Sequence, residues 1–182
     1  MKVLLPFFLL LSVQLLAQVT LPTNELGQVQ YQEIVRLPDA TRPTRQVATQ
    51  LRSWVDQQYP NEGDAEKHYD QENNVVFAKS VFLIDGQTVR YTLTLEAKFG
   101  RYRVTLTDLI TEAKGLSLPV QATSPTADEM SRMADNKTKS TNVIQQAVKQ
   151  QEDLYRQLNK ECRATLANLK EYMISLAEKK SN

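Results

Sequence analysis

The residue types that most often perform catalysis are scarce in this sequence. His68 is the only histidine and Cys162 is the only cysteine among 182 residues. A catalytic triad, a zinc site or a histidine acid–base pair needs more imidazole or thiolate groups than these two residues supply. The five glycines are isolated, so no phosphate-binding glycine loop is present. The sequence therefore predicts no catalytic residues, no metal site, no cofactor and a protein that is not an enzyme.

Both of these residues also have an ordinary structural interpretation. His68 lies in a polar stretch, 62–74, which is expected to form a loop or an edge excursion with His68 exposed. Cys162 falls on the apolar stripe of a predicted helix, where a thiol behaves as a small apolar side chain. A reactive thiol or an intermolecular disulfide is the alternative for Cys162. A disulfide within the chain is impossible because no second cysteine exists.

Catalysis by carboxylates needs only two acidic residues, so composition leaves it open as a third hypothesis. Asp108 is the one unusual acid, because strict alternation places it on the apolar face of a strand, opposite Tyr91. A buried carboxylate costs several kcal/mol unless it is hydrogen-bonded. We therefore expect Asp108 to accept a hydrogen bond from Tyr91 or from backbone amides, in a structural role. A ligand contact at the mouth of the sheet is the alternative.

Three aromatic residues complete a candidate ligand site. If a small lipid or metabolite bound between a helix and the apolar sheet face, Trp54, Tyr91 and Tyr102 would line its site together with Asp108. The alternative is that these aromatic rings form the core, because a domain of this size needs them for burial.

Periodicity predicts the elements that position these residues. Apolar residues at steps of three and four predict an amphipathic helix ending at Tyr59. Alternation predicts an early strand, 28–37, in which Glu33 is the exception, and three further strands, 75–84, 87–98 and 101–110. Two-residue turns at Asp85-Gly86 and Phe99-Gly100 fix the register. The predicted cross-strand pairs are Leu93–Leu106, Leu95–Val104, Ala97–Tyr102, Thr92–Thr107, Thr94–Thr105 and Glu96–Arg103.

The C-terminal part of the chain differs from this domain in composition. Residues 113–141, rich in serine, threonine and alanine and containing Pro119 and Pro125, are predicted to be a linker, with a weak helix over 126–134. Residues 142–180 are predicted to be a long helix of more than about 50 Å, which exceeds the roughly 33 Å of a ten-residue strand. Either it reaches a partner, as a homo-oligomer or coiled coil, or it packs back on its own domain.

The N-terminus, 1–17, has the profile of a cleavable signal peptide, with Lys2 followed by an apolar run to Ala17. This run is shorter than the roughly 20 residues of a membrane span, so no stable span is expected after cleavage. Without Lys2, 21 of the 22 basic residues would remain against 21 acidic ones. This balance disfavours binding to nucleic acid, and it also argues against attachment to an anionic membrane surface.

The run Lys98-Phe99-Gly100-Arg101-Tyr102-Arg103-Val104-Thr105-Leu106-Thr107-Asp108 resembles the hallmark of the domain of unknown function 4468 family. The resemblance covers about Leu21 to Ile110 and implies a TATA-binding-protein-like fold in a secreted protein of Bacteroidetes-type bacteria. It implies no activity and no catalytic residues, and function does not follow from the fold.

Together these observations predict an α+β protein with a β-α-β-β-β domain over 18–112. The leading functional hypothesis is an exported, periplasmic or secreted non-enzymatic module of the cell envelope. It would bind a protein partner or a second copy through the 142–180 helix. Small-ligand binding between the helix and the sheet is the alternative.

Overall fold

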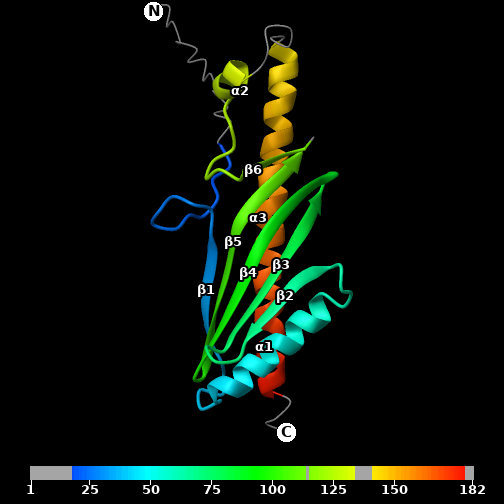
Figure 1. Ribbon diagram of the computed structural model, residues 1–182. Helices are drawn as coiled ribbons and strands as arrows, with labels where there is room; N and C mark the ends of the chain where they lie inside the picture. Colours follow the sequence, from blue (N-terminus) through cyan, green and yellow to red (C-terminus); the bar gives the residue numbers. More distant parts are fainter. Residues whose placement is uncertain (1–17, 114, 134–140, 179–182) are drawn as a thin grey trace, which may run out of the picture.

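Three consecutive strands of alternating apolar and polar residues form the centre of the molecule (Figure 1). The computed structural model describes residues 18–113, 115–133 and 141–178. Strands β3 (Val75–Ile84), β4 (Gln87–Lys98) and β5 (Arg101–Ala113) pair in antiparallel fashion. All six predicted pairs between β4 and β5 are confirmed: Leu93–Leu106, Leu95–Val104, Ala97–Tyr102, Thr92–Thr107, Thr94–Thr105 and Glu96–Arg103.

Three shorter strands complete a six-stranded sheet of order β1-β5-β4-β3-β2, in which β6 also pairs with β5. Strand β1 (Tyr31–Arg36) lies beside β5 near the turn after β4, and β6 (Leu116–Pro119) pairs with the far end of β5. Strand β2 (Ala65–Asp70) forms the opposite edge. His68 is therefore an exposed residue of an edge strand and not part of a loop.

Both long helices pack on the same face of the sheet. In α1 (Thr44–Gln58), Val47, Leu51, Trp54 and Val55 are buried, as the spacing predicts. Helix α3 (Thr141–Glu178) runs behind the strands along the sheet, and α1 lies across their lower end (Figure 1). No described helix covers the opposite face of the sheet, which is common for antiparallel sheets.

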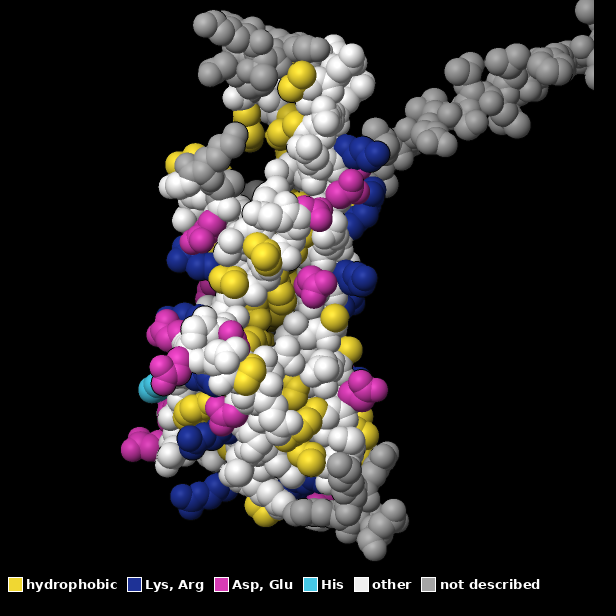
Figure 2. All heavy atoms as spheres, turned by 90° about the vertical axis from the view of Figure 1, so that its right-hand side faces the viewer, with side chains coloured by type: hydrophobic (Ala, Val, Ile, Leu, Met, Phe, Trp, Pro, Cys, Tyr) yellow, Lys and Arg dark blue, Asp and Glu magenta, His cyan; other side chains and the backbone are white. Residues whose placement is uncertain are grey.

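Helix α3 packs back on its own domain, the second of the two predicted alternatives. Its buried apolar residues are Leu154, Tyr155, Leu158, Cys162, Leu166, Leu169 and Met173. No residue from Thr141 to Gln151 is buried. Only these first turns of α3 therefore extend beyond the part of the helix that packs on the sheet. Figure 2 shows a vertical band of hydrophobic side chains with charged side chains of both signs toward the margins.

The predicted linker, 113–141, contains ordered elements that its composition did not indicate. It holds β6, and Ser124 and Ala122 form backbone hydrogen bonds with Val19 and Leu21. The predicted short helix is present as α2 (Ala127–Met133). Residues 134–140 lie outside the described residues, as does the predicted signal peptide, 1–17. Among the residues that are described, no helix is long and apolar enough to span a membrane.

The turn between β4 and β5 is enclosed by the loop that joins β1 to α1. The Gly100 N–H donates to the carbonyl of Arg42 at 2.9 Å, and the Leu37 N–H donates to the carbonyl of Gly100 at 2.9 Å. Gly100 has a φ of +63°, and a Cβ atom there would collide with the backbone of Ala40. Two independent constraints, conformation and space, therefore require glycine at this position.

We predict that Gly100→Ala lowers the free energy of unfolding by about 2–4 kcal/mol, because the left-handed conformation and the backbone collision both cost energy. Gly86→Ala is the matched control: its φ is +77°, but nothing lies within 4 Å of the added Cβ. This control should cost only about 1 kcal/mol. Urea unfolding of both variants measures the difference, and equal losses would contradict the enclosed turn.

Candidate functional site

Asp108 does not occupy the core position that strict alternation predicts. Arg90 pairs with Ile110 and Thr92 pairs with Thr107, so Asp108 and Leu109 together oppose Tyr91 in a β-bulge. Asp108 takes a φ of +53° and is exposed, whereas Leu109 is buried in its place. The expectation of a buried Asp108 was wrong, because the bulge adds one residue to β5 and reverses the faces beyond it.

The three predicted aromatic residues lie in the core. Trp54, Tyr91 and Tyr102 are each less than 5% exposed. Tyr102 is fully buried, and its hydroxyl has no hydrogen-bond partner among the described residues. The Tyr91 hydroxyl lies 2.8 Å from the Tyr59 hydroxyl, so Tyr59 takes the place predicted for Asp108 as its partner. The structure therefore fills the predicted ligand site with packed side chains.

Cys162 is a buried residue of α3 that faces the sheet. Burial raises the pKa of the Cys162 thiol to about 12, so the thiol is protonated at neutral pH. Among the described residues, no group of three or more His, Cys, Asp and Glu side chains could hold a metal ion. These groups offer no arrangement for nucleophilic or metal-assisted chemistry.

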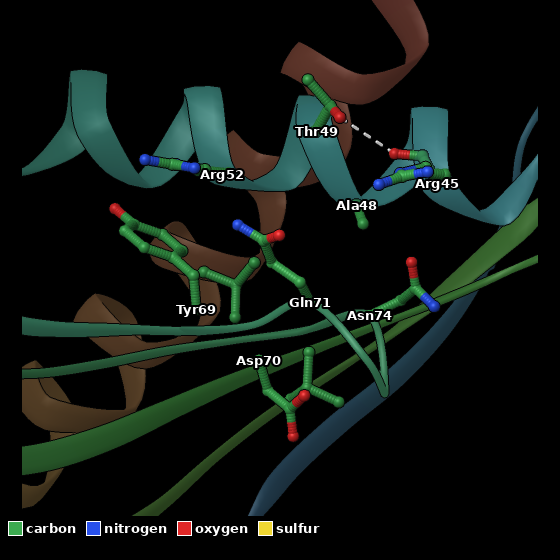
Figure 3. Close-up of a pocket in the computed structure, with 10 residues that line it drawn as sticks. Arg45, Ala48, Thr49, Arg52, Tyr69, Asp70, Gln71 and Asn74 are labelled. Atoms are coloured by element: carbon green, nitrogen blue, oxygen red, sulfur yellow. Dashed lines mark hydrogen bonds between the residues drawn. The ribbon is translucent and has the colours of Figure 1, made fainter.

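A groove of about 190 Å³ lies instead between α1 and the hairpin of β2 and β3 (Figure 3). Its lining residues are Arg45, Ala48, Thr49, Arg52, Tyr69, Asp70, Gln71, Asn74, Val75 and Val76. Helix α1 contributes the two arginines from one side, and the hairpin contributes polar side chains from the other. The groove thus combines cationic, amide and apolar groups at one end of the helix–sheet interface.

The two arginines of the groove differ in their surroundings. The Arg52 guanidinium lies 4.3 Å from the centre of the Tyr69 ring, and the Tyr69 hydroxyl donates to Asp56 at 2.6 Å. These contacts hold Arg52 against the Tyr69 ring in the wall of the groove. Arg45 forms none of the ion pairs found in the described part of the chain.

The one carboxylate that lines the groove is engaged by its own turn. Asp70 accepts hydrogen bonds from the backbone of Glu72 and Asn73 and from the Asn73 side chain. These bonds, above all those from Asn73, lower the pKa of the Asp70 carboxyl. Figure 3 shows this carboxylate directed away from α1. The groove therefore presents Arg45 without a carboxylate partner among the described residues, whereas Arg52 also forms a 3.9 Å ion pair with Asp56 on its own helix.

Periodicity could not identify this groove. Arg45 and Arg52 are seven residues apart, so they share one face of α1, but polar residues on an outward helix face are ordinary. Identifying the groove also required knowing that the hairpin 69–76 packs over that face of α1. The sequence indicated only a polar stretch there.

The fold itself is shared with known structures. It is an α+β fold of the TATA-binding-protein-like class, as the motif resemblance implied. A TBP-like protein from Parabacteroides distasonis superimposes with a TM-score of 0.60 at 12% identity, over 84% of this chain and 96% of that one. A DUF4468 family protein from Bacteroides ovatus superimposes with a TM-score of 0.55 at 13% identity, over 84% and 90%.

These likenesses confirm the predicted resemblance at the level of the fold alone. At such low identity they carry no site residues and no activity to this chain. No family model matches the sequence, and no curated protein matches it.

We predict that Asp108→Asn changes the free energy of unfolding by less than about 0.5 kcal/mol, because the side chain is exposed and asparagine tolerates positive φ. Asp108→Val should cost at least about 1 kcal/mol more, because a β-branched residue is strained in that conformation. Thermal unfolding of the two variants checks the bulge. A large loss from Asp108→Asn would instead support a structural role for the charge.

Proposed function

We propose that this protein is an exported, non-enzymatic binding module that holds a small anionic ligand in the groove between α1 and the β2–β3 hairpin. One observation carries the proposal: Arg45 and Arg52 line a single cavity whose only lining carboxylate is engaged elsewhere. Carboxylates and phosphates are the natural partners of paired guanidinium groups.

The position of Arg45 adds support. It lies in the first turn of α1, which contains no acidic residue. The N-terminal end of a helix is electropositive, so a cation there is unfavourable for the helix, whereas a bound anion is favoured. An anionic group beside Arg45 would therefore interact with both the guanidinium and the helix end.

The size of the groove limits the ligand. Pockets for drug-sized molecules usually measure about 300–1,000 Å³. A volume of about 190 Å³ suits a small acid or the acidic end of a longer molecule. Ala48, Val75 and Val76 supply apolar surface for a short hydrocarbon or ring attached to the acidic group. This retains small-ligand binding between helix and sheet, but with lining residues other than Trp54, Tyr91, Tyr102 and Asp108.

The non-enzymatic part rests on the lack of a reactive arrangement in the described residues. Cys162 is buried and protonated, and His68 is exposed on an edge strand. Export rests on the signal-peptide profile of residues 1–17. The compartment is proposed to be the cell envelope or its exterior.

We predict that benzoate and phenyl phosphate raise the melting temperature of the mature protein and bind measurably in isothermal titration. Arg45→Gln should weaken binding about tenfold, because it removes one charge-assisted contact. Lys160→Gln, which removes an exposed charge on α3, is the control and should leave the affinity unchanged. Equal affinities in all three proteins, or no binding of any small acid, would contradict the groove.

A second candidate function is self-association through the projecting start of α3. Residues Thr141–Gln151 contain no buried side chain, and Val143 is 46% exposed. Their only charge is Lys149, so two copies would meet with little repulsion, and Ile144 and Val148 share a helix face. Helix α2 already contacts α3 beside this segment (Figure 1). A second copy would cover the part of the nearly uncharged segment that α2 leaves exposed, in place of the whole 142–180 helix predicted from length alone.

Light scattering tests this candidate over a range of concentrations. Deleting the whole helix is uninformative, because α3 supplies much of the core. We predict a dimer for the mature chain, with self-association weakened or lost in Val143→Lys and little changed in Lys160→Gln. A monomer at every concentration would exclude this function.

A further inference from the structure

Three cations lie side by side across the uncovered face of the sheet, at its lower end. Arg101 on β5 is opposite Arg36 on β1 and opposite Lys98 on β4. Adjacent strands are about 4.8 Å apart, so this cationic row is about 10 Å wide. Like charges directly opposite each other destabilise a sheet.

The other basic strand residues of this face have acidic partners on it. Arg103 forms a bidentate pair with Glu96, Lys79 pairs with Glu66, and Arg90 pairs with Glu112. No member of the cationic row forms an ion pair with a described residue. The row therefore differs from Arg103, Lys79 and Arg90, each of which has an acidic partner.

An exposed aromatic side chain lies beside the cationic row. Phe99 joins Lys98 to Arg101 through the β4–β5 turn and is 62% exposed, although it is a large apolar residue. The turn is held by the two hydrogen bonds of Gly100, so Phe99 is presented on a rigid support. Ile34, two residues before Arg36 and on the same face, is 60% exposed.

The overall neutrality of the chain does not cancel this local charge. At physiological salt, charges are screened over about 8 Å, so an approaching surface senses the row and its neighbours. Three acids lie near this end, and Glu72 in the β2–β3 turn is exposed and forms no ion pair with a described residue, whereas the other two are engaged locally. Asp39 accepts hydrogen bonds from Thr41 and lies 3.5 Å from Arg42, while Asp70 is bound by Asn73.

We propose that the cationic row and Phe99 form a docking surface for a lipid bilayer that contains anionic headgroups. The phosphate groups would pair with Arg36, Lys98 and Arg101, and the Phe99 ring would enter the boundary between headgroups and acyl chains. A basic cluster beside an exposed aromatic residue at a turn suits a flat anionic surface. This inference is independent of the groove under α1.

Co-sedimentation with vesicles tests the proposal. The mature protein should bind vesicles of 30% phosphatidylglycerol in phosphatidylcholine, and should bind pure phosphatidylcholine at least about tenfold more weakly. Binding should weaken as salt is raised from 20 to 300 mM. Equal binding to both compositions, or no binding to either, would overturn the proposal.

Single substitutions test which residues bind the vesicles. Arg101→Gln should weaken binding to the anionic vesicles about fivefold, with a melting temperature that is unchanged or raised because like charges are removed. Phe99→Ala should also weaken binding, whereas Lys160→Gln should not. Equal losses from Lys160→Gln and Arg101→Gln would show that net charge alone acts.

A single-stranded oligonucleotide tests whether the row binds the phosphates of nucleic acid instead of those of lipid headgroups. We expect it to bind at least about tenfold more weakly than the anionic vesicles at the same salt concentration. Tighter binding to the oligonucleotide, lost in Arg101→Gln, would overturn the bilayer as the partner. Because Arg45→Gln is expected to leave vesicle binding unchanged, failure of this inference is separable from failure of the groove.

Discussion

The packing of α3 against the inner face of the sheet is the interaction on which the rest of the structure depends. Two asparagines of α3 receive hydrogen bonds from aromatic residues of the domain: Tyr31 donates to Asn159 at 3.0 Å and Trp54 donates to Asn168 at 2.9 Å. Lys170 forms a 2.7 Å ion pair with Glu33. A shift of α3 by one turn would leave the buried polar ends of both rings without partners, at about 1–3 kcal/mol each.

This packing also determines which surfaces remain available. Because α1 and α3 share one face, the other face of the sheet is uncovered, and its lower end displays the cationic row. Because α1 lies across the lower end, the β2–β3 hairpin leaves a groove against it rather than a closed core. The groove and the cationic row are therefore both consequences of one arrangement of helices.

The parts that sequence reasoning predicted were those governed by local periodicity. The register of β4 and β5 followed from two-residue turns and from agreement between both faces, and the buried stripe of α1 followed from helical spacing. Glu33 broke the alternation of β1, and its partner Lys170, 137 positions away, could not be found from local pattern. The bulge at Asp108 was missed because strict alternation was assumed to continue through a charged residue, when one extra residue instead turns Asp108 outward and Leu109 inward.

The site was less predictable than the fold because it depends on contacts between distant segments. The sequence indicated that the aromatic residues could be buried. Their packed rings fill the space between helix and sheet that was the candidate ligand site. The motif around Phe99-Gly100 gains a physical explanation. Gly100 is required by the enclosed turn, Tyr102 fills the core, and Arg103 pairs with Glu96. Lys98 and Arg101 are left unpaired at the surface, where the charges of Arg36 add to theirs.

The most direct test of this account is the reactivity of Cys162, which lies on the sheet-facing side of α3, compared with a cysteine introduced on the uncovered face by Lys79→Cys. Mass spectrometry after brief treatment with a thiol reagent at pH 8 reports both sites in one native protein. The account predicts rapid labelling at position 79, with Cys162 unlabelled until denaturant is added. Labelling of Cys162 at a comparable rate in native buffer would show that α3 does not pack on the sheet.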